Sequence, residues 1–216
     1  MLQFSFWDIL SNLLIATQWT LVLSAIAFVS GGIAGLILLF MRTSCVAPLE
    51  WFTKLYIEFF QGTPLLMQLF LFFFGVALFG IDVSPLLAAW LALMLWTSAF
   101  LTEIWRGCVE AVPRGQWEAS SSLALSYIEQ MRYVILPQAT RIAVAPTVGF
   151  SVQVIKGTAL ASIIGFVELT KAGTELNNAT FRPFLVYSLV ALIYFCLCFP
   201  LSWCAKKLEG RLNVAR

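Results

Sequence analysis

The residues with the clearest potential for chemistry are a lysine and three polar side chains within an apolar stretch of the last third of the chain. This group consists of Gln153, Lys156, Thr158 and Ser162. An ammonium group in apolar surroundings needs an anion or access to water, so Lys156 indicates either a ligand-binding site or a side chain that snorkels to a membrane surface. Glu58, Glu103 or the carboxylate of a bound solute would supply the anion.

A second polar interruption and a short row of charges lie in the first half of the chain. The interruption is Gln61, Gly62, Thr63 and Pro64, in an apolar run where a lipid-facing helix would leave backbone groups unsatisfied. Glu103, Arg106 and Glu110 follow at spacings of three and four residues, the spacing of ion pairs along a helix. No nucleophile or metal site accompanies this row, so we interpret it as structural pairing.

Several classes of chemistry are excluded by composition. The chain has no histidine to act as a general base or metal ligand, and its five cysteines lack metal-ligand spacing, so no metal site is predicted. It has no Gly-rich phosphate loop ending in Lys-Ser or Lys-Thr, so any ATP that its function uses must be bound by another subunit. The net charge of +2 does not suggest nucleic acid as a partner. A membrane-embedded enzyme is a weak alternative because few chemistries remain.

The elements that must position these residues are membrane spans. Hydrophobic residues make up 61% of the 216 residues and charged ones 11%, with a mean hydropathy of +0.91, so the bilayer is the expected solvent. Apolar runs of spanning length predict an all-α integral membrane protein, a single domain over 1–216. Its five transmembrane helices are expected at about 13–40, 59–79, 85–101, 142–167 and 184–203.

The first predicted helix contains Gly31 and Gly35, a small-xxx-small pair that lets another helix approach closely. Packing within the chain and contact with another subunit are equally compatible with this pair. No internal repeat is evident, and five spans do not divide into equal halves, so a complete pathway is expected to need a second copy or a sister chain.

The distribution of lysine and arginine predicts the orientation. Alternate connections and the C-terminus carry ten basic residues, including Arg42, Arg114 and Arg141, whereas the opposite set has only Lys171 and Arg182. The positive-inside rule therefore places the N-terminus outside and the C-terminus in the cytoplasm. The connection between the third and fourth spans is then cytoplasmic.

That connection, about 110–137, is a polar segment much longer than a passive loop requires. Good helix formers follow a turn at Pro113, and Ser126 stands three residues before Glu129, the spacing of a capping box. We therefore expect two short helices that meet near Leu125, the second closed by Pro137. A long amphipathic connection of this kind favours docking to another protein.

The polar segment resembles the cytoplasmic loop of the integral membrane subunits of bacterial ABC importers. The resemblance rests on Gly115-Gln116-Trp117-Glu118-Ala119-Ser120, Leu123 and Ile135-Leu136-Pro137-Gln138-Ala139. Three further segments are similar to the polar amino acid branch of this family, and the likeness extends over about 12–206. They are Glu58-Phe59-Phe60-Gln61-Gly62-Thr63-Pro64-Leu65-Leu66, Glu103-Ile104-Trp105-Arg106-Gly107 and Ile155-Lys156-Gly157-Thr158-Ala159-Leu160.

The resemblance implies a permease subunit of an ATP-driven amino acid importer in the bacterial inner membrane, working by alternating access. It implies two permease chains, a cytoplasmic ABC ATPase dimer that holds ATP and Mg²⁺, an external substrate-binding protein and surrounding lipid, with no cofactor in this chain. The residues expected to couple to the ATPase are Gly115, Gln116, Glu118, Ala119, Ser120, Leu123, Ala124 and Pro137. A permease for another small polar solute, and a channel or scaffold, are the alternatives.

The substrate pathway is expected to involve both polar interruptions. Our hypothesis is that Gln153, Lys156 and Thr158, with the break from Gln61 to Pro64, form a transient substrate site. Glu103 and Ser162 are further candidates along the pathway. Gly157 is expected to unwind the helix there and expose backbone groups.

Four positions depart from the family pattern. Ser120 replaces an alanine, and Ala124 stands where glycine is usual, which should restrict the bend to ordinary backbone angles. Gln61 stands where arginine is common, and Gly157 where an acidic or amide residue often follows the lysine. The last two bear on substrate preference, so no particular amino acid is inferred.

Overall fold

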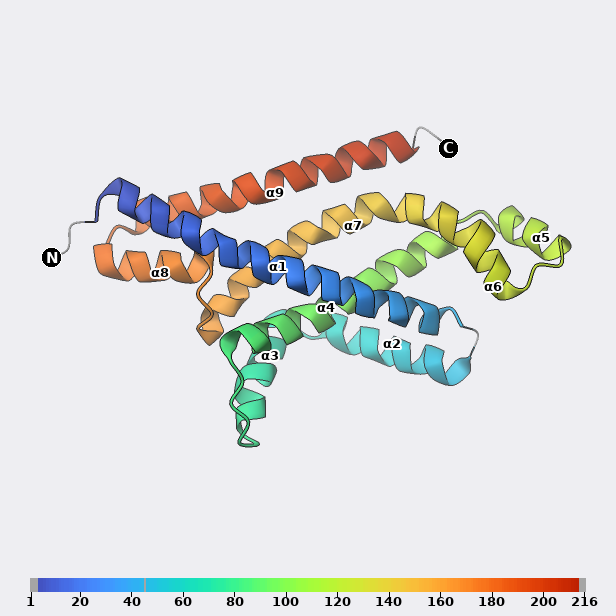
Figure 1. Ribbon diagram of the computed structural model, residues 1–216, viewed down its shortest axis with the longest axis horizontal. Coiled ribbons are helices and arrows are strands. Elements are labelled where there is room, and N and C mark those ends of the chain that lie inside the picture. Colours follow the sequence, from blue (N-terminus) through green and yellow to red (C-terminus); the bar gives the residue numbers. More distant parts are fainter. Residues whose placement is uncertain (1–3, 45, 214–216) are drawn as a thin grey trace.

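The computed structural model describes residues 4–44 and 46–213, and every regular element within these ranges is helical (Figure 1). The α-helices are α1 (Phe6–Arg42), α2 (Ala47–Gly62), α3 (Leu65–Phe70), α4 (Pro85–Glu110), α5 (Arg114–Ser122), α6 (Tyr127–Glu129), α7 (Leu136–Thr158), α8 (Leu169–Thr180) and α9 (Pro183–Asn213). A π-helical turn over Leu71–Gly75 extends α3, another over Gln130–Ile135 joins α6 to α7, and a 3-10 helix over Ala159–Ile164 follows α7.

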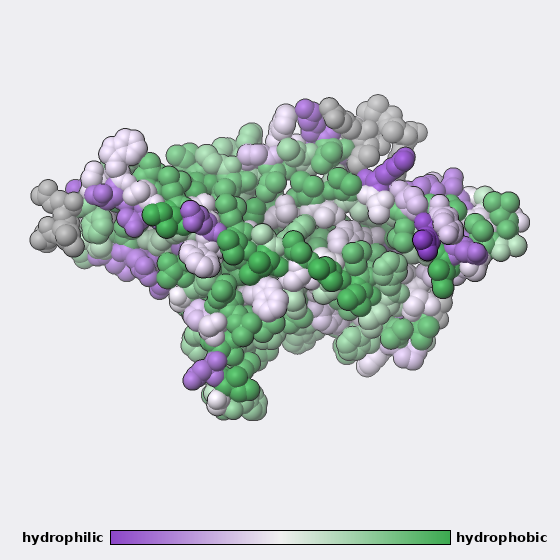
Figure 2. All heavy atoms as spheres, in the orientation of Figure 1, coloured by the Kyte–Doolittle hydropathy of each residue, from purple (hydrophilic) through white to green (hydrophobic). Residues whose placement is uncertain are grey.

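In the described ranges, four helical runs are long and apolar enough to cross a membrane. They are α1, α4, the run from Tyr127 to Ile164, and Pro183–Gly210 of α9. A fifth candidate is α2 together with α3 and its π-helical turn, two limbs bent by 101°. Five spans, as predicted, result when this bent pair counts as one. Figure 2 shows hydrophobic side chains over the middle of the elongated molecule and hydrophilic ones gathered toward its ends.

The predicted second span, about 59–79, is wrong in its bounds, whereas its predicted interruption from Gln61 to Pro64 coincides with a sharp bend. α2 begins at Ala47, and the chain turns sharply where α2 ends. Thr63 is extended, with φ −109° and ψ 141°, because the residue before a proline avoids the helical region. Pro64 also has no N–H to continue the backbone hydrogen bonds of α2, so α3 begins as a new helix in a different direction.

Side chains satisfy the polar break at this bend. Gln68 is 3% exposed, and its Nε2 donates to the carbonyl oxygens of Phe60 at 2.9 Å and Thr63 at 3.2 Å. Gln61 Nε2 donates to the carbonyl oxygen of Ala99 on α4 at 3.2 Å. Backbone groups that a break would leave unpaired in hydrocarbon therefore find protein partners.

The course of the chain agrees with an odd number of crossings. In Figure 1, α1, α4 and α9 run in one direction along the long axis and α7 runs in the other, so that the start of α1 and the end of α9 lie toward opposite ends. Because α1 and α4 share a direction, the bent pair must return the chain between them. The basic ends of α1, α4 and α9 gather at the end that holds α5 and α6, whereas Lys171 and Arg182 belong to the region of α8. Arg216, part of the predicted basic set, lies outside the described residues.

α1 packs on α4 through the glycine pair. A Cβ on Gly31 would lie 2.7 Å from Thr97 Cβ and Cγ2, and one on Gly35 would lie 3.1 Å from the carbonyl oxygen of Ser98. Thr102 Oγ1 also donates to the Gly35 carbonyl oxygen at 3.1 Å. Of the two alternatives for this pair, packing within the chain is therefore correct.

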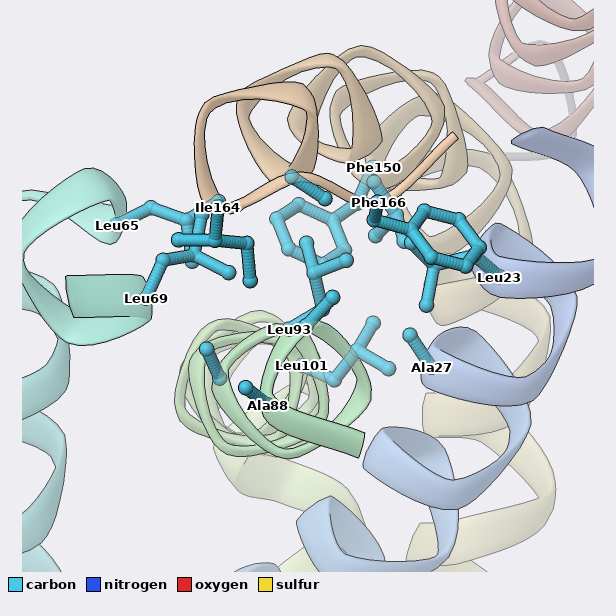
Figure 3. Close-up of a cluster of buried hydrophobic side chains, with 14 residues drawn as sticks. Leu23, Ala27, Leu65, Leu69, Ala88, Leu93, Leu101, Phe150, Ile164 and Phe166 are labelled. Carbon is cyan, nitrogen blue, oxygen red and sulfur yellow. The ribbon is translucent and has the colours of Figure 1, made fainter. Parts of the chain in front are cut away.

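The largest buried cluster among the described residues surrounds the N-terminal part of α4 (Figure 3). Ala88 and Leu93 of α4 are fully buried, and Leu65 of α3, Leu23 of α1 and Phe150 of α7 converge on the same region. Small side chains on α4 allow its neighbours to approach. The cluster therefore joins the bent pair to α1 and α7.

The polar segment forms two helices, as predicted, but its end was predicted wrongly. The capping box at the start of α6 is present, with Glu129 Oε2 accepting from the Ser126 N–H at 2.8 Å. Pro137 does not close the second helix. The π-helical turn Gln130–Ile135 ends two residues before Pro137 and accommodates the proline ring and its missing N–H, so the helix continues into α7.

The turn between α5 and α6 places Ala124 in the left-handed region, with φ 53°. The expectation that alanine would confine the bend to ordinary angles is therefore wrong. Leu125 N–H donates to the Ser120 carbonyl oxygen at 3.3 Å and Ala124 N–H to the Ser121 carbonyl oxygen at 2.9 Å, the bond pattern of a Schellman cap. This cap requires the left-handed residue whatever its side chain.

We expect Ala124→Gly to raise the free energy of unfolding by about 1 kcal/mol, because a left-handed alanine carries a steric cost that glycine does not. The matched control is Ala191→Gly in the ordinary helical backbone of α9, which should lower the free energy of unfolding by roughly 0.5–1 kcal/mol. Thermal unfolding of the purified chain in detergent measures both. Equal destabilisation by the two substitutions would contradict the strain at Ala124.

Candidate functional site

The first candidate region is α5 and the turn that follows it, held on a small apolar cluster. Ser120 is only 2% exposed, and its Oγ donates to the Trp117 carbonyl oxygen at 2.9 Å. Trp117 packs against a cluster of Val109, Val112, Met131, Ile135 and Ala139. One face of α5 is therefore committed to the body of the protein.

The outward face of α5 carries most of the residues predicted to couple. Gly115, Glu118 and Ala119 are exposed on it, and Leu123 is 75% exposed just beyond its end. Ser120 lies on the opposite, buried face, so its expected place on the docking surface is wrong. Ile128 of α6, which sequence reasoning missed, is also 75% exposed, and two large apolar side chains thus project at the tip of this segment.

Polar bonds fix α5 relative to the helix that follows. Gln138 Nε2 donates to Gln116 Oε1 at 3.2 Å, and Gln130 Nε2 donates to the Leu125 carbonyl oxygen at 2.8 Å. The hydroxyl of Tyr127 donates to the carbonyl oxygen of Thr43 at the end of α1. Hydrogen bonds therefore connect α5 to α7, and α6 to the end of α1.

The charged row on α4 forms the ion pairs that its spacing predicted. Arg106 binds Glu103 Oε2 through NH2 at 2.7 Å and Glu110 Oε1 through NH1 at 2.5 Å. Glu58 lies 3.9 Å from Lys54. Both glutamates considered as internal partners of Lys156 thus pair with other cations, and Lys156 forms no ion pair within the described chain.

Gln61 and Glu103 share a polar cavity of about 220 Å³ between α1, α2 and α4. Its lining also includes Arg42, Lys54 and Glu58, so both signs of charge face it. Arg42 binds Glu50 at 2.7 Å through NH1, while its Nε, which is buried, has no hydrogen-bond partner in the described structure. An arrangement of this kind suits a small zwitterion or ordered water.

The α7 candidates do not gather into one site. Gln153 and Lys156 are exposed on one face, whereas Thr158 is fully buried with its Oγ1 donating to the Ile155 carbonyl oxygen at 2.7 Å. Ser162 Oγ likewise donates to a local carbonyl oxygen, at 2.6 Å. The expected unwinding at Gly157 is wrong, because the α-helix continues through this residue to Thr158 and then tightens into a 3-10 helix.

Gly157 instead provides close packing with the bent pair. A Cβ there would lie 3.2 Å from Leu65 Cδ2 and 3.2 Å from Leu93 Cδ2. The residue that follows Lys156 therefore lies beside the first residue of α3, next to the break at Thr63 and Pro64. The two polar interruptions are therefore neighbours in the fold. The Gln61 side chain, however, faces the polar cavity that it shares with Glu103.

Glu168 is a buried carboxylate that the sequence analysis missed. It is 0% exposed, and its Oε1 accepts from the Lys171 N–H at 2.9 Å as the cap of α8. Its Oε2 accepts from the Tyr194 hydroxyl at 2.8 Å and from Thr20 Oγ1 at 3.4 Å. One carboxyl group thus joins α1, α8 and α9 through hydrogen bonds, one of them at a helix N-terminus. No local pattern signals this site, because Oε1 accepts from a backbone N–H and the donors to Oε2 come from distant segments.

Comparison with known proteins identifies close likenesses over nearly the whole chain. A family model described as binding-protein-dependent transport system inner membrane component matches residues 31–214. The L-cystine transport system permease protein TcyB of Bacillus subtilis (strain 168) is 36% identical over 99% of this chain and 90% of its own length. The glutamine transport system permease protein GlnP of Escherichia coli (strain K12) is 32% identical over 96% of each.

Solved structures show the same arrangement. A crystal structure of an amino acid ABC transporter with histidines superposes with a TM-score of 0.90 at 32% identity, covering 97% of this chain and 100% of the other. An inward-facing MetNI methionine ABC transporter superposes with a TM-score of 0.72 at 16% identity, covering 95% and 96%, and supports the fold alone.

Proposed function

This chain belongs to the family of binding-protein-dependent transport system inner membrane components, and from that premise we propose that it is a permease subunit of an ATP-driven amino acid importer. It is a multi-pass protein of the inner membrane and is not itself an enzyme, because ATP hydrolysis in this family belongs to a separate subunit. The observation that carries the substrate class is the 0.90 TM-score, at 32% identity, to an amino acid ABC transporter. The names of the relatives support the same class.

Coupling to the ATPase is assigned to the exposed face of α5 and the turn after it. We propose that Gly115, Glu118, Ala119 and Leu123 enter a cleft of a cytoplasmic ABC ATPase, which binds ATP and Mg²⁺ as a dimer. Gln116 and Ala124 hold the shape of the segment, and Pro137 lies where it joins α7. The buried side of α5 supports this role, because a docking element must be anchored to transmit movement.

The substrate pathway is assigned to the space around the bent pair. A second permease copy or a sister chain would complete it, and an external substrate-binding protein would deliver the amino acid at the end opposite α5. Gln61 and Glu103 suit the cytoplasmic side of the pathway, because a polar cavity with both charges accommodates a zwitterion. Gln153 and Lys156, together with the break at Gly62, Thr63 and Pro64, suit its middle, with Thr158 and Ser162 supporting the helix there.

Co-purification tests the assembly. A tagged chain isolated from its native membrane should bring down an ABC ATPase, and in nanodiscs the complex should hydrolyse ATP faster when a loaded binding protein is added. Uptake from a panel of amino acids into proteoliposomes then identifies the substrate. Solute flux without ATP would favour a channel, and the absence of any ATPase would favour a scaffold.

Lys156→Met is expected to raise the KM for uptake by about tenfold or more, the effect of losing a charged hydrogen bond to a substrate carboxylate. Lys171→Met on α8 removes the same charge elsewhere and should leave KM unchanged. Proteoliposome uptake at graded substrate concentrations measures both variants. Unchanged kinetics in Lys156→Met would instead assign this side chain to snorkelling.

A further inference from the structure

Two adjoining cavities form a groove between the C-terminal third of α1 and the run from α6 into α7. The inner cavity, about 360 Å³, is lined by apolar side chains that include Leu36, Trp105 and Val144. The outer cavity, about 460 Å³, opens near the end of α1 and is lined by Phe40, Ser44 and Arg132, among others. Leu136 lines both, so the cavities meet at the start of α7.

The inner part of the groove has the chemistry of a hydrocarbon site. The indole N–H of Trp105 has a partner within the protein, since its Nε1 donates to Thr147 Oγ1 at 2.9 Å, and the ring contributes an apolar wall to the cavity. Leu36 and Val144 at the rim are each 45% exposed, so the groove opens sideways from the bundle. At membrane depth such an opening meets lipid chains.

The mouth of the groove carries a positive charge. Arg132 lines the outer cavity beside Thr43 and Ser44, with its guanidinium 5.5 Å from the centroid of the Tyr133 ring. The nearest carboxylate along its own helix, Glu129, accepts from Ser126 Oγ at 2.7 Å, and Arg132 forms no ion pair with any part of the chain that is described. A cation at the polar end of an apolar groove complements an anionic amphiphile.

The length of the groove matches one leaflet. From Arg132 to Thr147 a helix advances roughly 22 Å at 1.5 Å per residue. Half of a bilayer, from its centre to the outer edge of the headgroups, measures about 20–22 Å. We propose that the groove binds one anionic phospholipid of the cytoplasmic leaflet, with its headgroup at Arg132 and Ser44 and an acyl chain along Leu136 toward Thr147.

A lipid in this position would bind both α1 and the segment that leads to α5. Tyr127 already joins α6 to Thr43 at the mouth of the groove. An anionic phospholipid would extend that connection inward along Leu136. The site goes beyond the proposed transport function, since it concerns how the surrounding membrane supports the coupling segment, and its leaflet rests on the proposed orientation.

The experiment uses the permease purified with its ATPase in nanodiscs of phosphatidylethanolamine that contain phosphatidylglycerol with a diazirine on one acyl chain. After illumination, mass spectrometry should locate adducts on peptides of α1 and α7 that line the groove. Arg132→Gln should lower the adduct yield there about fivefold, the contribution of one basic residue near an anionic headgroup. Arg141→Gln, an equal loss of charge on an exposed site of α7 outside the groove, should leave the yield unchanged.

A second variant tests the apolar part independently. Ala143→Trp places a large ring in the inner cavity and should abolish adducts while the complex still elutes as one species. Equal yields from a diazirine phosphatidylcholine probe, or no effect of Arg132→Gln, would overturn the anionic site. Efficient disulfide formation between copies carrying Val144→Cys would also overturn it, because a second copy would then occupy the groove. None of these outcomes depends on which solute is transported.

Discussion

Ala119→Arg should abolish ATP-dependent uptake while leaving the chain folded and inserted. Ala119 is exposed on the outward face of α5, and its methyl group allows a partner to come close. An arginine there would occupy the space of the proposed ATPase cleft without disturbing the cluster that holds the opposite face. Uptake in proteoliposomes should fall to the background, with the purified variant eluting as the wild type does. Glu118→Lys should act in the same way.

Gly210→Arg is the matched control, because it adds the same side chain to an exposed position at the basic end of α9, where no described atom beyond the adjoining helical backbone lies within 4 Å of the new Cβ. Its uptake should equal that of the wild type. Ser120→Arg should behave differently from both, since a charge forced into a site that is 2% exposed would lower the yield of folded protein. Normal uptake by a well-expressed Ala119→Arg protein would refute docking through this face.

Gly31→Ala should destabilise the chain strongly, whereas the same change at the next residue should not. A Cβ at Gly31 would lie 2.7 Å from two atoms of Thr97 and 2.9 Å from the Met94 carbonyl oxygen, so α1 and α4 must separate. A Cβ at Gly32 has its nearest neighbours at 3.8 Å. Overpacking of this kind costs about 1–3 kcal/mol.

Heating the detergent-solubilised variants and measuring the fraction that remains monodisperse would compare the pair directly. Both substitutions confer the higher helix propensity of alanine, so their difference isolates the contact between the helices. Gly31→Ala should lose monodispersity at a clearly lower temperature than Gly32→Ala. Equal midpoints would mean that α1 and α4 do not meet at this glycine.

The parts of the fold that were predictable are those set by local sequence and by the bilayer. The apolar lengths of α1, α4 and α9 follow from the thickness of hydrocarbon that they must cross. The capping box of Ser126 and Glu129 is a local pattern, and it marks the start of α6 correctly. The ion pairs of Arg106 likewise follow from spacing along one helix.

Errors arose where neighbouring structure overrides a local preference. Pro137 was predicted to end a helix, but the π-helical turn before it accommodates the proline, and sequence alone does not reveal that turn. Ala124 takes a glycine-like conformation because two backbone bonds of the cap require it. In both cases the hydrogen bonds of the surrounding turn determine the backbone.

The candidate site was only partly predictable, because the sequence of a single segment does not show which residues of other helices will lie beside it. The face of α5 that contains Ser120 becomes buried only because Trp117 meets side chains of α4 and α7. Gln61 and Glu103 share a cavity although they lie on different helices. In the sequence, Glu168 is a single glutamate near the end of an apolar stretch. Its structural role depends on hydrogen-bond donors from three other positions in the chain.

The continuous helical run from Tyr127 to Ile164 has a mechanical consequence. At Gly157 this run packs tightly against Leu65 and Leu93, and Gly157 lies much nearer to Ile164 than to Tyr127. A rod that pivots there has arms of roughly 45 Å toward Tyr127 and roughly 14 Å toward Ile164. A wide swing at the long arm therefore becomes a displacement about one third as large, applied with about three times the force, at the short arm. Such gearing converts a large, weak stroke into a small, strong one.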